Sequence, residues 1–259
     1  MRSVILATAA ALFVGGPVAA QTTLGPGAHA GPAKTARPYT PGRTADGQPD
    51  LQGTWVNFDS TPFEAPGAEP PRAANAAVAD VGPPAHWTDH SSPMAARRTA
   101  MVVDPPDGRV PVLPWAEAKR DHDLAHLGDH YVHETPWVRC ITRGVPGGMF
   151  PAGYNNGYRF IQTPGFVVIV YEMLHEARII PLDGRPHVGR NIRLWNGDPR
   201  GRWEGNILVV ETTNYNDKGS IATSAAAGRI RGIPQSDALH VVERFTRVDA
   251  ETLSYEYTV

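Results

Sequence analysis

The second half of the chain is built from short runs of aromatic and β-branched residues, and tight-turn dipeptides separate these runs. Residues 158–163 and 166–174 form two of them, with only Pro164-Gly165 in between. Proline followed by glycine suits a type II turn, because glycine takes the positive φ that the third turn position requires. Two runs joined by so short a turn are predicted to pair as antiparallel strands.

The alternation of run and turn continues to the end of the chain. Further turns are expected at Asn196-Gly197, Gly205-Asn206 and Asp249-Ala250. The runs around them are 177–182, 193–195, 202–204, 207–213, 239–247 and 252–259. Such a series predicts a mainly β fold, an antiparallel β-barrel with a β-sandwich as the alternative. The last run reaches Val259 without a turn, so either it is an edge strand or the sheet continues beyond this sequence.

Residues 1–20 have the three-part layout of a secretory signal peptide. Arg2 precedes an apolar stretch, and Val18 and Ala20 place small residues at the −3 and −1 positions before Gln21. A membrane span needs about 20 apolar residues. The apolar stretch here is shorter, and glycines and a proline interrupt it. We therefore predict cleavage after Ala20 and a periplasmic or secreted protein without a membrane span.

Composition divides the rest of the chain. Residues 21–48 are rich in Gly, Pro, Ala and Thr and are interpreted as a flexible leader before a single β-rich domain at 49–259. Within that domain, Pro and Ala dominate residues 60–114, which we expect to wrap the periphery of the core. One helix is predicted over 115–127, with Pro114 at its start and Gly128 at its end.

Several classes of protein are excluded or disfavoured. A net charge of −2 argues against nucleic-acid binding by bulk electrostatics. The single cysteine, Cys140, rules out a disulfide framework and is expected to be buried and inert. No Gly-rich loop joins a strand to a helix, so no dinucleotide or other cofactor is expected. The absence of a Gly-x-Ser-x-Gly motif disfavours a serine hydrolase.

Several sequence blocks resemble a family of secreted bacterial β-rich proteins without an established reaction. The blocks are Ile-Gln-Thr-Pro-Gly at 161–165, Arg-Ile-Ile-Pro-Leu-Asp-Gly-Arg-Pro-His at 178–187, Gly-Arg-Trp-Glu-Gly at 201–205 with Leu-Val-Val at 208–210, and Leu-His-Val-Val-Glu-Arg-Phe at 239–245. The resemblance covers 47–58 and 115–259 and implies an exported β-rich domain. Family members often carry Pro-His-Ser-Glu where this chain has Pro-Gln-Ser-Asp at 234–237, and they usually continue past Val259.

A second resemblance bears on the fold. Gly53-Thr54-Trp55 is similar to the Gly-x-Trp signature on the first strand of lipocalins. It favours a calycin-like barrel over the sandwich.

Carboxylates and histidines within the predicted strands are candidates for acid–base chemistry. Side chains at i and i+2 share a face of a strand, so a glutamate among apolar neighbours points toward an apolar environment. Such a glutamate either pairs with an arginine or serves as a polar group in a ligand cavity, and both interpretations stay open. Imidazoles beside carboxylates suit proton transfer near neutral pH. The candidate catalytic residues are Glu172, His175, His187, Glu211, His240 and Glu243.

Aromatic and basic residues of the same strands are candidates for ligand binding. The tryptophans are interpreted as core or cavity wall, with a sugar-stacking platform as the alternative. The candidates are Tyr171, Arg178, Arg193, Trp195, Trp203 and Arg244.

His122, His126 and His130 are spaced four apart, so a continuous helix would place them on one face, where pairs of histidines chelate zinc. Gly128 is expected to end the helix before His130, which breaks that geometry. The sequence therefore predicts a solvated polar segment and no metal site.

Together these features predict an exported protein that binds a small molecule in an apolar cavity carrying a few carboxylate, histidine and arginine groups. The alternative is a cofactor-free acid–base enzyme, such as a lyase, isomerase or hydrolase, that uses glutamate and histidine in the same cavity. An envelope interaction protein acting through its Pro-rich region is a third hypothesis. The missing nucleophile motif favours binding, and whether the protein is an enzyme stays open.

Overall fold

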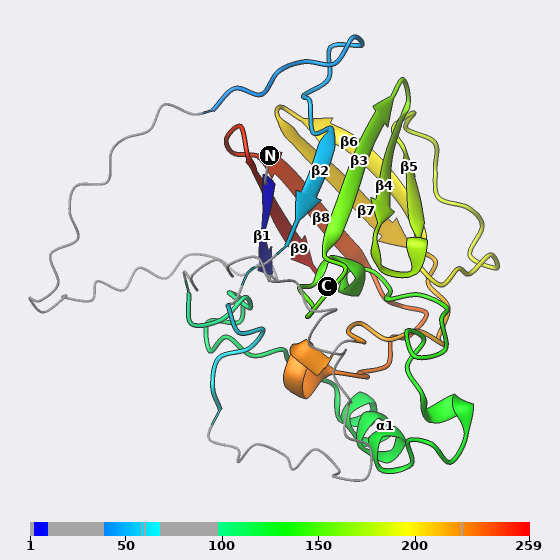
Figure 1. Ribbon diagram of the computed structural model, residues 1–259. Coiled ribbons are helices and arrows are strands. Elements are labelled where there is room, and N and C mark those ends of the chain that lie inside the picture. The colour runs from blue at the N-terminus through cyan, green and yellow to red at the C-terminus, as the bar shows by residue number, and fades with distance from the viewer. Residues whose placement is uncertain (1–2, 10–38, 58, 60, 68–97, 224) are drawn as a thin grey trace, which may run out of the picture.

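Nine strands form one sheet in the computed structural model, which describes residues 3–9 (backbone only), 39–57, 59, 61–67, 98–223 and 225–259 (Figure 1). The order across the sheet is β5-β4-β3-β2-β1-β9-β8-β7-β6. The strands are β1 (Ser3–Ala9), β2 (Gly53–Val56), β3 (Gly157–Thr163), β4 (Phe166–Tyr171), β5 (Ala177–Pro181), β6 (Asp198–Glu204), β7 (Ile207–Thr213), β8 (Val241–Arg247) and β9 (Thr252–Thr258).

The sheet consists of two antiparallel four-stranded halves, β2–β5 and β6–β9. Strand β1 lies between them and pairs in parallel with both β2 and β9. The predicted turns at Pro164-Gly165, Gly205-Asn206 and Asp249-Ala250 each join two paired strands, whereas Asn196-Gly197 does not. Thr163 pairs with Phe166 across Pro164-Gly165, and Gly165 has the positive φ, +81°, that a type II turn needs.

The predicted strand at 193–195 does not form. Leu194 makes only an isolated parallel bridge with Tyr215, and β6 begins earlier than predicted, at Asp198. The side-chain amide of Asn214 bonds the carbonyls of Val188, Gly189 and Ile192 at 3.1 Å each. These long-range bonds hold 188–192 as a loop. The sequence of the loop itself does not indicate that Asn214 will bind it.

The mainly β fold is confirmed, whereas a closed barrel is not. Within the described residues, no ladder of hydrogen bonds joins the two edge strands β5 and β6. The edges instead pack through side chains: a Cβ added at Gly201 of β6 would lie 2.6 Å from Leu182 and 2.7 Å from Ile180. The layout is compatible with the β-sandwich alternative.

The core lies between the two halves of the sheet. Phe160 of β3 and Phe245 of β8 meet there with ring centroids 5.5 Å apart, and Trp55 and Tyr255 are also fully buried. Of the predicted peripheral segment 60–114, residues 60 and 68–97 lie outside the described residues. Its described part places Phe63, Ala100, Met101 and Val102 among the buried residues, so these positions belong to the core.

The helix α1 spans Pro114–Ala125, close to the predicted 115–127, and lies beyond one end of the strands (Figure 1). Proline occupies its first turn, where the missing N–H costs nothing. Short 3-10 helices are η3 (Tyr131–His133), η4 (Gly147–Met149), η5 (Met173–His175) and η6 (Ala225–Ile230). Among the described residues, none of the helices combines the length and apolar character needed to cross a membrane.

Two expectations concern other parts of the chain. Cys140 is exposed, so the prediction of a buried thiol is wrong; the residue lies in a turn, where its N–H bonds the carbonyl of Trp137 at 2.9 Å. Residues 1–2 and 10–20 of the predicted signal peptide and 21–38 of the predicted leader lie outside the described residues.

Candidate functional site

A cavity of about 580 Å³ opens near the C-terminal end of β9, beside the N-terminus of α1. Its walls come from segments far apart in sequence: 102–116, 221–240 and the ends of β8 and β9, with Phe63 and Phe150 behind them. Most of the lining is apolar. The principal apolar wall residues are Val110, Val112, Leu113, Trp115, Ile221, Ile230, Ile233, Leu239 and Val242.

A half-buried ion pair joins two of these walls. Arg229 of η6 donates to both oxygens of Glu64, at 2.7 and 3.0 Å, and to the carbonyl of Val110 at 2.7 Å. Glu64 in turn accepts the N–H of Val110 at 2.7 Å. Prolines on either side of Val112 keep this stretch extended, so it can run along the cavity rather than coil away from it.

Two buried polar atoms of the cavity wall lack hydrogen-bond partners within the described part of the chain. One is the hydroxyl of Tyr257 and the other is Oε1 of Gln235, whose Nε2 already donates to the carbonyl of Asn216 at 2.8 Å. Burial raises the pKa of the Tyr257 hydroxyl, so it stays a neutral donor and acceptor. The side chain of Gln235 fits against Gly219, where any Cβ would collide with it at 2.4 Å. The wall beside the cavity therefore holds a potential donor and a potential acceptor, and a ligand pairs with them when their side chains turn toward it.

A histidine and a carboxylate meet at the rim. His240 lines the cavity, and its Nε2 lies 3.0 Å from Oε1 of Glu211. Both side chains are about half exposed, at 50% and 42%. Arg202 reaches the other oxygen of Glu211 at 4.0 Å. Of the candidate catalytic residues, these two are the ones that the structure brings together.

Glu243 lies in the interior rather than at the cavity. Its Oε1 accepts from Arg178 Nη1 and from the Tyr255 hydroxyl, each at 2.9 Å, and Arg178 also donates to Thr212 at 2.8 Å. Burial lowers the pKa of Arg178, but the Glu243 carboxylate outweighs this and holds it above its ordinary value. Tyr171 lies beside the pair, and burial raises the pKa of its hydroxyl to about 12. Of the two interpretations of Glu243 that the sequence allowed, an ion pair with an arginine or a polar group in a ligand cavity, this arrangement is the ion pair.

The remaining catalytic candidates are scattered. Glu172 is exposed and accepts the N–H of Gly157 at 2.9 Å. His175 is exposed in η5, and His187 Nδ1 lies 3.2 Å from Asp198 Oδ2. The structure does not bring these three candidates together at the cavity.

The ligand-binding candidates also divide between the interior and the surface. Tyr171 and Arg178 are in the interior cluster described above. Arg193 pairs with Asp237, and Arg244 donates to Glu204 at 2.9 Å on the outer face. Trp195 is half-buried, and Trp203 packs against the core. Tyr257 and Gln235 line the cavity but were not predicted as ligand-binding residues. For Tyr257 the sequence does hold a signal, because Tyr255 and Tyr257 alternate along β9 and both point to the buried side.

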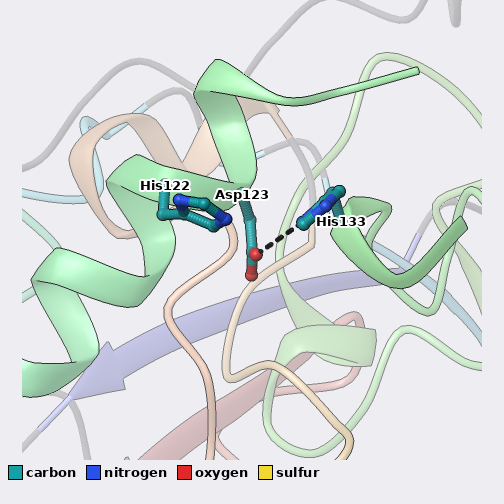
Figure 2. A group of neighbouring side chains, drawn as sticks. All are labelled: His122, Asp123 and His133. Atoms are coloured by element: carbon teal, nitrogen blue, oxygen red, sulfur yellow. Dashed lines mark hydrogen bonds and ion pairs between the residues drawn. The ribbon is translucent and has the colours of Figure 1, made fainter. Parts of the chain in front are cut away.

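His122, His126 and His130 do not share one helical face, as expected, because α1 ends before His130. The ring of His130 packs instead against Tyr131. The chain then folds back through η3 and brings His133 to Asp123, with 3.0 Å between Nδ1 and Oδ1. Figure 2 shows Asp123 between His122 and His133. Burial raises the pKa of Asp123, but hydrogen bonds from His133 and Lys119 outweigh it and hold this pKa below its ordinary value.

No protein-family model matches this chain, and neither a curated protein nor a solved structure matches it.

Proposed function

We propose that this protein binds a small, mainly apolar molecule with a polar end in the cavity beside β9. The observation that carries the proposal is the pair of unpartnered polar atoms, Tyr257 Oη and Gln235 Oε1, which lie buried in a mainly apolar wall. Leaving buried polar atoms unpaired costs roughly 1–3 kcal/mol each, and a ligand that pairs them recovers this. A volume of about 580 Å³ lies within the usual range of ligand pockets.

A neutral fluorophore tests the cavity directly. N-phenyl-1-naphthylamine should bind the purified protein, and 1-decanol should displace it. Ala238→Trp, which fills the cavity from its exposed rim, should abolish fluorophore binding. Tyr257→Phe should keep fluorophore binding but weaken decanol about two- to tenfold, the value of one hydrogen bond.

The matched control is Tyr131→Phe, which removes the hydroxyl of an exposed tyrosine in η3. It should leave both measurements unchanged. Unaltered fluorophore binding by Ala238→Trp would exclude this cavity as the site.

Acid–base catalysis is a second candidate function, favoured by the contact between His240 and Glu211 at the rim. In such an enzyme Glu211 would orient the imidazole, and His240 would exchange a proton with the bound molecule. Incubation with a cell extract separates the two functions, because a binder retains a compound whereas an enzyme transforms it. His240→Asn should stop a transformation while leaving fluorophore binding intact.

We also propose that the protein is exported, with residues 1–20 removed. The support for export is the signal-peptide layout of the sequence. Intact-mass analysis of the secreted or periplasmic protein should give a chain that begins at Gln21. A mature chain that retains Met1 would reject export by this route.

A further inference from the structure

Three imidazoles gather around one carboxylate at the end of α1. His122 and His126 stack with ring centroids 4.2 Å apart, and their distances to the ring of His133 are 5.3 and 5.6 Å. The potential ligand atoms of His122, Asp123 and His133 all lie within 4.8 Å of one another. Residues from two separate elements, α1 and η3, thus converge on one point (Figure 2).

Neighbouring hydrogen bonds hold these groups in suitable orientations. Lys119 Nζ binds Oδ2 of Asp123 at 2.7 Å and leaves Oδ1 facing His133. Nδ1 of His126 bonds the carbonyl of His122 at 2.7 Å, so Nδ1 carries the proton and Nε2 keeps its lone pair. Outer contacts of this kind commonly orient metal ligands.

The spacing suits a metal ion. Two ligands on a tetrahedral zinc ion with bonds of about 2.0–2.1 Å lie roughly 3.3 Å apart. His133 and Asp123 are already near this separation at 3.0 Å. His122 is exposed, so its ring can turn inward by the small distance that remains.

We propose that His122, Asp123 and His133 form a binding site for a divalent transition metal, with zinc as the ion that this ligand set fits best. Two imidazoles and one carboxylate are an established zinc ligand set, whereas calcium and magnesium prefer oxygen ligands alone. The fourth position is open to water or to Nε2 of His126. The site is separate from the cavity beside β9, and it stands whether or not that cavity binds a ligand.

Isothermal titration of the metal-free full-length protein with Zn²⁺ tests the site. We expect one tight equivalent. His122→Ala, His133→Ala and Asp123→Asn should each weaken it by about tenfold or more. Cobalt should bind at the same place and give the visible absorption of four-coordinate Co²⁺, which the His133→Ala variant should lose.

His130→Asn is the matched control. The substitution removes an imidazole from the same segment. Asparagine still offers an acceptor for the N–H of Val132, which donates to Nδ1 of His130 in the unaltered protein. Its zinc affinity should equal that of the unaltered protein, and equal melting temperatures without metal should show that every variant folds. Absence of the tight equivalent, or an equal loss in the His130→Asn control, would overturn the site.

Discussion

Arg178 on β5 and Glu243 on β8 form an ion pair across the interior, with side-chain exposures of 4% and 0%. The two strands belong to different halves of the sheet, so the pair links halves that share no hydrogen-bonded ladder at this edge in the described residues. Thr212 accepts from Arg178 and the Tyr255 hydroxyl donates to Glu243, which helps to keep both charges buried, although Nε of Arg178 has no hydrogen-bond partner among the described residues.

We expect Glu243→Gln to lower the free energy of unfolding by roughly 3–5 kcal/mol, because Arg178 would remain buried without its counter-charge. Urea unfolding measures this. The double variant Arg178→Met with Glu243→Leu should recover most of the loss, since neither charge is then buried alone. Glu211→Gln, at an exposed position, should change stability by less than about 1 kcal/mol. Similar effects of Glu243→Gln and Glu211→Gln would contradict a structural role for the interior pair.

Gly201 provides a second test of how the halves meet. A Cβ here would lie 2.6 and 2.7 Å from side-chain carbons of Leu182 and Ile180, so Gly201→Ala should force the edges apart. Overpacking of this kind costs about 1–3 kcal/mol. Gly189→Ala, where an added Cβ meets nothing within 4 Å, is the control and should be neutral. Thermal unfolding of both variants decides whether β5 and β6 are in contact in solution.

The hairpins could be predicted because their turn chemistry is local. Pro164-Gly165 and Gly205-Asn206 each fix the register of their neighbours within a few residues. The loop at 188–192 could not be predicted in the same way. Its conformation depends on the side chain of Asn214, more than twenty residues away, for which no period or turn signal exists.

The cavity was beyond sequence reasoning for a related reason. Its walls come mostly from segments without periodicity, such as 110–116 and 230–240, so no pattern marks their inward faces. The histidine cluster was half predicted: helical spacing finds His122 and His126, but only the fold-back through η3 adds His133.

Glu176 should make stability depend on pH. Burial raises the pKa of its carboxyl above the ordinary value, although hydrogen bonds from Thr142 and Asn196 oppose this. The folded state thus favours the protonated form. Its stabilising contribution is complete below the ordinary pKa of about 4.5 and is lost as the pH rises through the raised value.

Glu176→Gln imitates the protonated form and should not show this loss. The glutamine Oε1 can accept from Asn196 while its amide donates to Thr142, whose hydroxyl also donates to Asn196 Oδ1 at 2.9 Å. The variant should equal the unaltered protein at about pH 4 and exceed its stability at about pH 7. Urea unfolding at both values checks this, and a difference that does not change with pH would contradict it.

Arg143 is buried, and its three guanidinium nitrogens have no hydrogen-bond partner within the residues that the structure covers. Burial lowers the pKa of this guanidinium because the charged form is poorly solvated. We expect Arg143→Met to raise the free energy of unfolding by about 1 kcal/mol or more, since an apolar side chain of similar length removes a buried charge. A destabilised Arg143→Met variant would show that the guanidinium has a partner in solution.

Strand β1 occupies the middle of the sheet, yet it falls within the segment that export would remove. It pairs with β9 from Thr252 to Tyr257 and with β2 at Trp55 and Val56. Without it, the edges of β2 and β9 would present unpaired backbone groups, which promote association between chains. We therefore expect a protein of residues 21–259 to self-associate more strongly than the full-length chain in sedimentation velocity at equal concentrations. In that shortened protein, Ser254→Lys should place a charge on the β9 edge and suppress the association. Identical sedimentation of the shortened and full-length proteins would show that β1 does not protect these edges from pairing with other chains.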